Sequence, residues 1–452
     1  MKIKLPKQVS YIIGELEKHG FEAYAVGGCV RDSILGRIPD DWDITTSAKP
    51  EQVKRIFRKT IDTGIEHGTV TVMIEREGYE VTTYRIDGEY EDSRHPKEVV
   101  FTSNLVEDLK RRDFTINAMA YSESSGLVDV FDGIGDISKK VIRCVGNAKE
   151  RFSEDALRIL RAVRFAAQLK FQIEEETKEA IQKLAVNLNH ISAERIQTEL
   201  VKLLVSPQPE RIREAYELGI TKVILPEFDA MMTCTQENIH HMYTVGEHTV
   251  QALKQVESDK VLRLAVLFHD AGKPAAKSVD QQGVAHFYDH AMKSADMSER
   301  ILRRLKFDND TIFKVKKLIE LHDNRPSLKK SSVRRLTVKC STELFEDLIK
   351  VKRADTLAQS QYQREEKLAY LQGIWNLYQE IIRDKECIKL KDMEISGRDL
   401  LALGIPQGKD IGRILGELFE MVLEEPEKNT KEYLTDFVKG KYYNMFGDSE
   451  RL

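Results

Sequence analysis

The spacing of apolar and polar positions changes near residue 145, and the change divides the chain into two kinds of structure. Before it, FEAYAVGG, GTVTVMIE, YEVTTYR and KEVVFTS alternate or are rich in β-branched residues, which predicts strands. VRDSILG and PEQVKRIF lie between them with helical spacing. After residue 146, apolar residues recur every three and four positions in segments such as EDALRILRAVRFAAQL, ERIQTELVKLL, EHTVQALKQV, SERILRRLKF and KVKKLIELH. We therefore expect an α+β head followed by an all-α remainder.

The length of the chain predicts several domains. A chain of 452 residues is too long for one hydrophobic core. Soft boundaries, rich in Pro, Ser or charge, fall at SPQPER, NRPSLKKSS and DKECIKLKD. We expect four parts: a head (1–145), a helical neck (146–210), a helical body (211–360) and a helical tail (361–452).

Composition and charge narrow the class of protein. With 41% hydrophobic and 32% charged residues, the chain has the composition of a soluble globular protein, and no stretch approaches 18 uninterrupted apolar residues. The five cysteines are scattered and form no CxxC, which is typical of reduced thiols in a cytoplasm. The N-terminus lacks an apolar signal region, so we expect a cytoplasmic protein without membrane attachment. Because the net charge is −4, a nucleic-acid partner would have to meet a local basic surface.

The stretch PDDWDITT (39–46) carries the first candidate chemistry. A proline followed by aspartates is common in solvated turns, but Trp42, Ile44 and two threonines resemble a strand. On a strand, Asp41 and Asp43 would project from one face and Trp42 from the other, with Asp40 left to the turn. Two close carboxylates repel unless a cation joins them, and Mg²⁺ suits such a pair together with substrate phosphates.

Three further stretches of the head flank this pair. AVGGCVRD (25–32) is predicted to join a strand to a helix, where Gly27 and Gly28 permit close approach of a phosphate, although an ordinary tight turn looks the same. Glu80, in YEVTTYR, is a candidate third acid or an exposed edge residue. LKRRDFTINAMAY supplies candidate phosphate and ribose contacts beside an apolar helix face: Arg111, Arg112, Asp113 and Asn117.

Together, GGxxRD, the Asp-x-Asp strand, RRDFTINA and EDALR resemble the class II tRNA nucleotidyltransferase (CCA-adding enzyme) and bacterial poly(A) polymerase family. That family belongs to the polymerase β-type nucleotidyltransferases. The resemblance implies metal binding by Asp41 and Asp43, a triphosphate at Gly27 and Gly28, and support of that turn by Arg31 and Asp32. It implies CTP, ATP and tRNA as partners and template-independent addition of C, C and A. DGEYEDSRHP (87–96) is similar to the flexible loop that the switch from C to A requires.

We also expect the neck to select which nucleotide is added. If EDALRILRAVRFA (154–166) is one helix, Asp155 and Arg158 share a face. Cytosine and adenine present an amino donor beside a ring-nitrogen acceptor, which suits an acceptor and a donor; uracil and guanine present the inverse pattern. An ordinary surface ion pair explains the same spacing, and the family resemblance favours the selecting role. Arg195 and Glu199, in HISAERIQTELVKLL, are expected to brace the neck.

A histidine cluster marks the body. Seven of the eleven histidines lie between residues 240 and 322. LFHDAGKP and its neighbours resemble the HD phosphohydrolase superfamily. The resemblance implies a metal site that suits Mn, Fe, Co or Ni, with 2′,3′-cyclic phosphodiesterase or phosphatase activity. Its expected ligands are His248, His269, Asp270, His290, His322 and Asp355. A fold that has lost the metal and only packs or holds tRNA is the alternative.

The basic runs between residues 300 and 353 could follow a phosphate backbone, and residues 395–423 resemble the tRNA-contacting tail of the family. Two alternatives to CCA addition stay open. One is a poly(A) polymerase or A-only enzyme of the same family. The other is an HD phosphohydrolase whose head has become an RNA-binding module.

Overall fold

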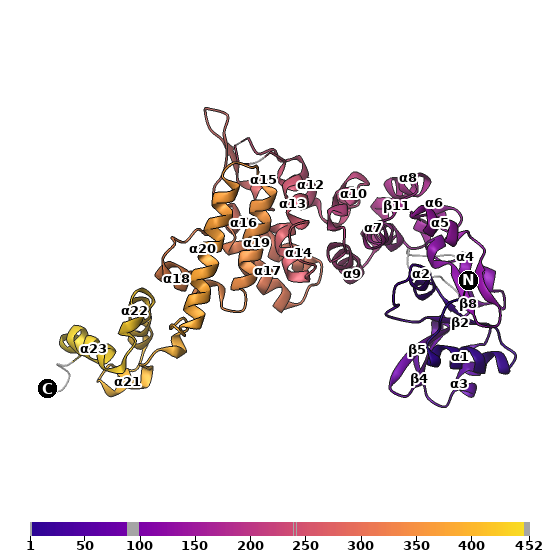
Figure 1. Ribbon diagram of the computed structural model, residues 1–452, viewed down its shortest axis with the longest axis horizontal. Helices are drawn as coiled ribbons and strands as arrows, with labels where there is room; N and C mark the ends of the chain where they lie inside the picture. The colour runs from indigo at the N-terminus through magenta and orange to yellow at the C-terminus, as the bar shows by residue number, and fades with distance from the viewer. Residues whose placement is uncertain (1, 88–98, 238, 241, 447–452) are drawn as a thin grey trace. The chain divides into compact units, whose positions relative to one another are not determined.

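The computed structural model describes residues 2–87, 99–237, 239–240 and 242–446 (Figure 1). The chain forms two compact units. Unit 1 comprises Met1–Ala230 with Arg303–Phe307, and unit 2 comprises Met231–Leu302 with Asp308–Leu452. A mixed sheet at the start and helices afterwards confirm the predicted α+β class. The expected limits at 145, 210 and 360 stay predictions.

A seven-stranded sheet forms the head in unit 1, in the order β3-β4-β5-β2-β1-β8-β9. Central β1 is antiparallel to both β2 and β8, whereas β2 and β5 run parallel. The residues of β1, β2 and β8 are all buried, which explains their near-continuous apolar and β-branched character. The strands are β1 Ala23–Val26, β2 Ile44–Thr46, β3 Thr60–Gly64, β4 Thr69–Ile74, β5 Glu77–Thr83, β8 Met119–Ser122 and β9 Gly126–Asp129, with β6 Arg85–Asp87 and β7 Val99–Phe101 as a separate pair.

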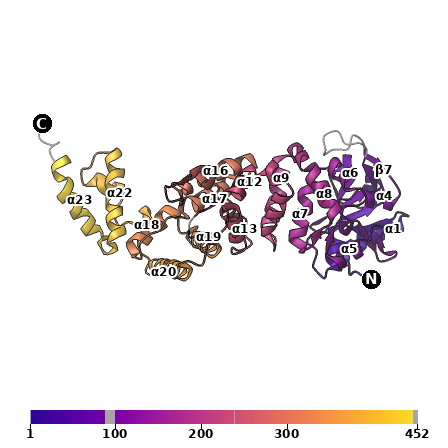
Figure 2. The ribbon, with the colours of Figure 1, turned by 90° about the horizontal axis from the view of Figure 1, so that it is seen from above.

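Helices pack on the sheet of the head, and further helices form the neck. α1 contacts β1, and α2 follows directly from β1. α3 contacts β4 (Figure 1). In the neck, α7 and α9 lie side by side in both views (Figures 1 and 2). The helices are α1 Lys7–Lys18, α2 Gly28–Ile34, α3 Pro50–Ile56, α4 Leu105–Lys110, α5 Gly133–Lys139, α6 Ala148–Glu154, α7 Leu157–Leu169, α8 Glu175–Leu184, α9 Ala193–Leu204, α10 Ile212–Glu217 and α11 Thr221–Ile224.

Unit 2 is a helical bundle with a helical extension. Its centre is built by α13, α14, α17 and α19, which contact one another, and α20 packs against α18 and α19. The helices are α13 Val245–Leu253, α14 Lys260–Phe268, α15 Lys273–Ala276, α17 Asn309–Leu321, α18 Lys330–Cys340, α19 Phe345–Ala358, α20 Arg364–Arg383, α21 Gly397–Ala402, α22 Lys409–Glu424 and α23 Lys431–Phe446. Helices α12 Pro226–Thr233 and α16 His290–Arg304 have residues in both units.

The prediction of a purely α-helical remainder is wrong in two places. β10 Val141–Ile142 pairs with β11 Gln172–Ile173, and β12 Lys277–Val279 pairs with β13 Ala285–Phe287. The second pair is a hairpin closed by Asp280, whose Oδ1 accepts the N–H groups of Gln282 (2.9 Å) and Val284 (3.0 Å). Gly283 adopts a φ of +81° in the same turn, so Asp and Gly supply turn chemistry that outweighs helical spacing.

The tail carries its own apolar core. Residues from α21, α22 and α23 bury one another, including Leu400, Leu418, Val422, Leu434 and Tyr442. A cluster of this kind accounts for the apolar spacing in residues 395–423. Across the described ranges, we find no helix with both the length and the apolar character needed to cross a membrane.

Candidate functional site

The turn after β1 needs glycine. Gly27 has φ +85° and ψ −130°, a conformation that side chains with a Cβ rarely adopt. A Cβ at this position would also lie 3.0 Å from Nη1 of Arg112. The Gly27 N–H donates to the carbonyl of Met119 on β8 (3.1 Å), which ties the turn to the sheet. Gly28 then begins α2. The guanidinium of Arg112 therefore lies against the turn between β1 and α2.

Three carboxylates gather at the edge of this turn. Ile44 of β2 pairs with Val81 of parallel β5, so Glu80 is the neighbour of Asp43 across the two segments. Burial raises the pKa of Glu80, and the charges of Asp43 and Asp41 raise it further. Burial likewise raises the pKa of Asp43, although its side chain is open to solvent.

The predicted strand begins later than expected. β2 starts at Ile44, so Asp41 and Asp43 lie in the segment leading into it. The carbonyl of Asp43 accepts the N–H of Val26 on β1 (3.0 Å), and β1 ends there because the chain turns at Gly27. The set Asp41, Asp43 and Glu80 offers oxygen atoms alone and carries like charges, which fits a hard cation such as Mg²⁺.

A buried polar network holds the glycine turn against later segments. Arg31 donates to Oδ1 of Asn117 (2.6 Å) and to both carboxylate oxygens of Asp32 (3.0 and 2.8 Å). Asn117 donates in turn to Asp113 (3.1 Å), and Asp113 accepts Nε of Arg161 on α7 (2.8 Å). Burial would raise the pKa of Asp113, but Arg161 outweighs it and holds the pKa below its usual range. Direct ribose contacts by Asp113 and Asn117 stay predictions.

Sequence reasoning missed Asp108, which positions two of the expected residues. Its fully buried carboxylate accepts Nε of Arg111 (2.9 Å), lies 3.5 Å from Nη2 of Arg112, and accepts the hydroxyl of Thr45 on β2 (3.1 Å). The three- and four-residue spacing from Asp108 to the two arginines is a helical ion-pair pattern that the sequence contains. Arg112 also lies near enough to Asp43 to lower the pKa of that carboxyl.

The predicted shared helix face of Asp155 and Arg158 is wrong. α6 ends at Glu154, Asp155 is extended (φ −140°, ψ 102°), and α7 starts at Leu157. Asp155 breaks the helix because its Oδ1 accepts the N–H of Leu157 (3.0 Å), as an N-terminal cap does.

Both side chains are held by other partners. Arg195 of α9 donates to the two carboxylate oxygens of Asp155 (3.3 and 2.7 Å). Arg158 donates to Glu154 (2.7 Å) and to the carbonyl of Arg111 (2.8 Å). Glu199 pairs with buried Arg164. The neck therefore presents Asp155 and Arg158 from a helix junction rather than from one helix.

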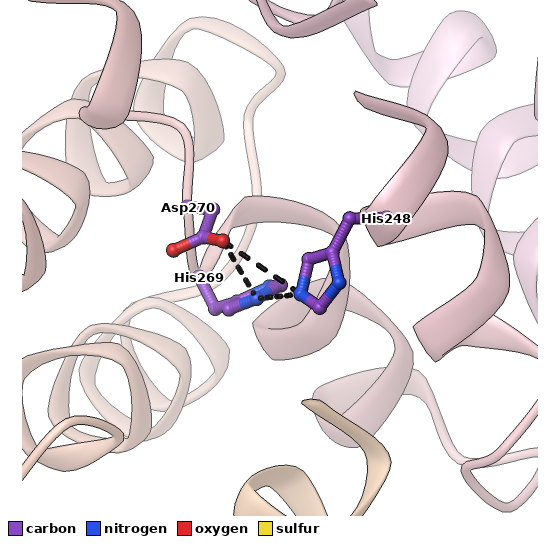
Figure 3. Close-up of side chains that lie close together, drawn as sticks. All are labelled: His248, His269 and Asp270. Atoms are coloured by element: carbon purple, nitrogen blue, oxygen red, sulfur yellow. Dashed lines mark hydrogen bonds and ion pairs between the residues drawn. The ribbon is translucent and has the colours of Figure 1, made fainter. Parts of the chain in front are cut away.

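The structure brings together all six residues expected from the histidine cluster. Around His248, Nε2 lies 2.9 Å from Asp355 and 3.3 Å from Nε2 of His269. Asp270 Oδ2 lies 3.2 Å from His269 Nε2 and 3.8 Å from His248 Nε2 (Figure 3). The other oxygen of Asp270 lies 3.5 Å from His290 Nε2 and 3.8 Å from His322 Nε2. Asp270 thus belongs to two groups of ligand atoms, one from each carboxylate oxygen.

Backbone carbonyls orient three of these imidazoles. Nδ1 of His269 bonds the carbonyl of Val266 (2.7 Å), Nδ1 of His290 that of Phe287 (2.9 Å), and Nδ1 of His322 that of Ile319 (2.7 Å). A proton on Nδ1 leaves the Nε2 lone pair facing carboxylate oxygens and other Nε2 atoms. Lone pairs that face one another at 3–4 Å need a cation between them, so the donor set fits one or two metal ions. Burial, and then His269, lower the pKa of His322 to about 4, which favours the neutral, ligating form.

The basic runs between residues 300 and 353 are largely engaged with acids. Arg334 pairs with Glu386, Arg335 with Glu420 (3.0 Å), and Lys330 with Glu386 (2.9 Å). The expected phosphate path along this surface therefore loses much of its charge to contacts within the protein. In the loop motif at 87–96, residues 88–96 lie outside the described residues.

Three family models match this chain. The Poly A polymerase head domain matches residues 23–143, and the RNA and SrmB-binding site of polymerase A matches residues 170–232. The tRNA nucleotidyltransferase domain 2 matches residues 278–438.

The chain is similar to CCA-adding enzymes over most of its length. It is 33% identical to that of Levilactobacillus brevis over 426 residues, which is 94% of this chain and 95% of the relative. It is 50% identical to that of Lactobacillus johnsonii over 214 residues, 47% of this chain and 54% of the relative. It is 53% identical to that of Enterococcus faecalis over 199 residues, 44% and 49%. Several of these relatives are thus matched over only about half of their length.

Solved structures extend the similarity. The Bacillus stearothermophilus CCA-adding enzyme in complex with CTP has a TM-score of 0.70 and 28% identity, over 98% of this chain and 99% of that one. The Thermotoga maritima CCA-adding enzyme complexed with tRNA shares the fold, with a TM-score of 0.61 and 22% identity over 97% of this chain and 99% of that one.

Proposed function

This chain belongs to the CCA-adding enzyme family, and from that premise we propose that it adds C, C and A to the 3′ end of tRNA, using CTP and ATP and releasing pyrophosphate. The observation that carries the proposal is the meeting of Asp41, Asp43 and Glu80 beside the glycine turn under Arg112. A cytoplasmic location suits these substrates, and the five buried thiols are all unpaired.

In the proposed reaction, the terminal hydroxyl of tRNA attacks the α-phosphate of the nucleotide, and the bond to pyrophosphate breaks. Asp41, Asp43 and Glu80 are the residues that would hold Mg²⁺, which supplies activation of the hydroxyl and charge stabilisation of the leaving group. The turn at Gly27 and Gly28 lets the triphosphate approach the backbone, and Arg112 faces it with a guanidinium. Arg31 and Asp32 keep the turn in place through Asn117.

Nucleotide selection rests on Asp155 and Arg158 at the junction of α6 and α7. Asp155 accepts from the amino group of cytosine or adenine, and Arg158 donates to the adjacent ring nitrogen. Uracil and guanine present a carbonyl beside an N–H, so both protein groups would meet the wrong partner, at about 1–3 kcal/mol for each unpaired group. Arg195 positions the Asp155 carboxylate for this role.

The tail and the body are the proposed tRNA-contacting parts, with recognition of the shape of the stacked arm rather than of bases. α22 and α23 form a separately packed module suited to such a contact. Variants that weaken tRNA binding without slowing addition at saturating tRNA would support this assignment.

The direct test offers tRNA lacking its 3′ CCA with CTP, ATP or both, and sequences the products. The proposal expects CC with CTP alone and CCA with both. Runs of A would favour the poly(A) or A-only alternative. Asp41→Ala should abolish incorporation. If incorporation survives, the head is not the polymerising site, which would favour an HD phosphohydrolase whose head only binds RNA.

A second activity in unit 2 is favoured by the convergence of His248, His269, Asp270, His290, His322 and Asp355. It is hydrolysis of a phosphate ester, as a phosphatase or 2′,3′-cyclic phosphodiesterase. Water attacks phosphorus, the P–O ester bond breaks, and the released alkoxide takes a proton. Mn, Fe, Co or Ni suits the mixed imidazole and carboxylate donors and supplies activation of water there. His269→Ala should abolish hydrolysis and leave CCA addition intact, and Asp41→Ala should do the reverse.

A further inference from the structure

A pocket of about 330 Å³ adjoins the histidine cluster within unit 2. Its lining includes His322 and Asp355, two of the expected metal ligands, together with Arg325, Lys367 and Tyr370. Ligand pockets for small molecules have volumes of about 300–1,000 Å³, so this pocket has room for a small ligand. We call it the α20 pocket, because Lys367 and Tyr370 lie on α20.

The α20 pocket also contains the carboxylates of Asp323, Asp355 and Glu366, which match its cations only in part. Within the described part of the chain, no carboxylate forms an ion pair with Lys367, whose Nζ contacts Oε1 of Gln359 (2.8 Å) and Nδ1 of His240 (3.3 Å). Arg325 pairs with the exposed carboxylate of Asp323, at 3.4 Å. Burial, and then the charge of Arg325, lower the pKa of Lys367, so the two cations lie close enough to repel. An anion between them would relieve that repulsion.

The cations are coupled to the proposed metal centre by one side chain. Gln359 donates from Nε2 to Oδ1 of Asp355 (3.1 Å) while its Oε1 accepts from Lys367. Only Gln359 therefore separates an anion bound by Lys367 from Asp355, an expected ligand of the metal centre.

Aromatic rings accompany the cations. Tyr370 lines the pocket and is held by its hydroxyl, which donates to the carbonyl of Pro326 (2.5 Å). Tyr362 packs edge-on against His240, with ring centroids 5.2 Å apart, next to Lys367. Cations interleaved with aromatic rings are the usual means of binding a single nucleic-acid strand, because bases stack on the rings and phosphates meet the charges.

We infer that the α20 pocket is a subsite for the internucleotide phosphate next to the 3′ end of an RNA strand. The terminal phosphate then lies at the histidine cluster and the neighbouring phosphate at Arg325 and Lys367, with a base against Tyr370. The centre therefore acts on RNA ends in preference to free mononucleotides. This inference rests on the hydrolase activity proposed for unit 2, and it adds the class of substrate. The same chemistry could come from a free nucleotide that carries a second phosphate.

The test compares three substrates: a trinucleotide ending in a 2′,3′-cyclic phosphate, a 2′,3′-cyclic mononucleotide, and the same mononucleotide with a 5′-phosphate. The variant is Arg325→Met with Lys367→Met. Since a charge-assisted hydrogen bond contributes a factor of about 10–100 to affinity, KM for the trinucleotide should rise by that factor with kcat little changed. KM for the cyclic mononucleotide should rise less than about threefold. A pair of basic residues outside the α20 pocket, half-buried Lys350→Met with exposed Arg383→Met, serves as control.

A binding measurement separates failure of the subsite from failure of the hydrolase. Fluorescence anisotropy of a labelled trinucleotide with an unreactive 3′-phosphate reports binding without turnover. If the wild-type protein hydrolyses no substrate, the hydrolase proposal fails, and weaker trinucleotide binding by the double variant alone still supports the subsite. Equal effects on trinucleotide and mononucleotide, or unchanged trinucleotide binding, would overturn the inference. A preference for the 5′-phosphorylated mononucleotide over the trinucleotide would replace the RNA end by a free nucleotide.

Discussion

The buried ammonium group of Lys352 on α19 donates to the backbone carbonyl of His322, 2.7 Å away, at the end of α17. It also donates to the carbonyl of Asn324 (2.5 Å), so one cation holds the turn that carries an expected metal ligand. Burial lowers the pKa of Lys352 to about 8, and no carboxylate forms an ion pair with it in the described residues. Lys352 is thus a positioning residue for His322.

Lys352→Met should loosen this turn. Removing the ammonium leaves two buried carbonyls without a donor, so the free energy of unfolding of unit 2 should fall by about 1–3 kcal/mol. Metal content of unit 2, measured after dialysis, should fall with it, while CCA addition by unit 1 stays unchanged. The control is Lys350→Met on the same helix, since Lys350 pairs with surface acids. Wild-type metal content in the Lys352 variant would contradict the role.

Glu80→Gln should show whether the third acid takes part in catalysis. If Glu80 shares metal binding with Asp41 and Asp43, its loss lowers kcat for CMP incorporation about 10–1,000-fold, the range for losing one transition-state interaction of about 1.4–4 kcal/mol. The Mg²⁺ concentration for half-maximal rate should also rise.

Glu77→Gln is the matched control, because Glu77 lies on the same strand and is exposed, with Tyr79 as its partner. Equal rates for the two variants would show that Glu80 is an exposed edge residue that takes no part in catalysis.

The fold was predictable from local spacing because most of its elements are amphipathic or fully buried. β1, β2 and β8 are buried throughout, α7 is buried on nearly all sides, and α9 buries one continuous face. Prediction from local spacing failed where a single polar side chain determines the backbone conformation. Asp155 ends one helix and caps the next within a segment whose apolar period runs on unbroken. Asp280 and Gly283 likewise close a hairpin inside a helical region.

The residues of the candidate sites also fall into two groups, those that the sequence predicted and those that only the structure shows. Motifs located the acids and the histidines, since their chemistry depends on residue type and spacing. Apart from Asp108, which is local to its two arginines, the residues that hold them come from distant segments, where motifs could not find them. Arg161 reaches Asp113 across 48 positions, and Lys352 reaches His322 across 30. Such pairings exist only once tertiary packing is known.

Arg195→Gln should relax nucleotide selection. Arg195 holds both carboxylate oxygens of Asp155, so its loss frees the acceptor that tests the amino group of the base. The ratio of kcat/KM for CTP to that for UTP should fall about 10-fold or more, because discrimination by a hydrogen-bonding pair is about 1–3 kcal/mol.

Lys202→Gln on the exposed side of the same helix is the comparison, and it should keep the wild-type ratio. If Arg195→Gln lowers rates for both nucleotides equally, Arg195 braces the neck without shaping selection.

Asp108 should give the head an acid-sensitive component of stability. Burial would raise the pKa of Asp108, but Arg111 and Arg112 outweigh burial and hold the pKa below its ordinary value of 3.8. A depressed pKa means that the folded state releases this proton more readily than the unfolded state. The stabilisation is therefore fully present above pH 3.8 and is lost as the pH falls through the folded pKa. Asp108→Asn leaves two guanidinium groups without their buried partner, which at neutral pH should lower the unfolding free energy by about 3 kcal/mol.

The measurement can be confined to the head, because the chain has two tryptophans and Trp42 lies there. In a Trp375→Phe background, Trp42 fluorescence during urea unfolding reports the head at each pH from about 7 to about 3. The difference in unfolding free energy between the proteins with and without the Asp108→Asn substitution should be constant down to about pH 4 and then shrink, since protonated Asp108 becomes neutral like asparagine. A difference that stays constant through about pH 3 would mean that Asp108 titrates alike in both states, and that its two arginines do not stabilise it.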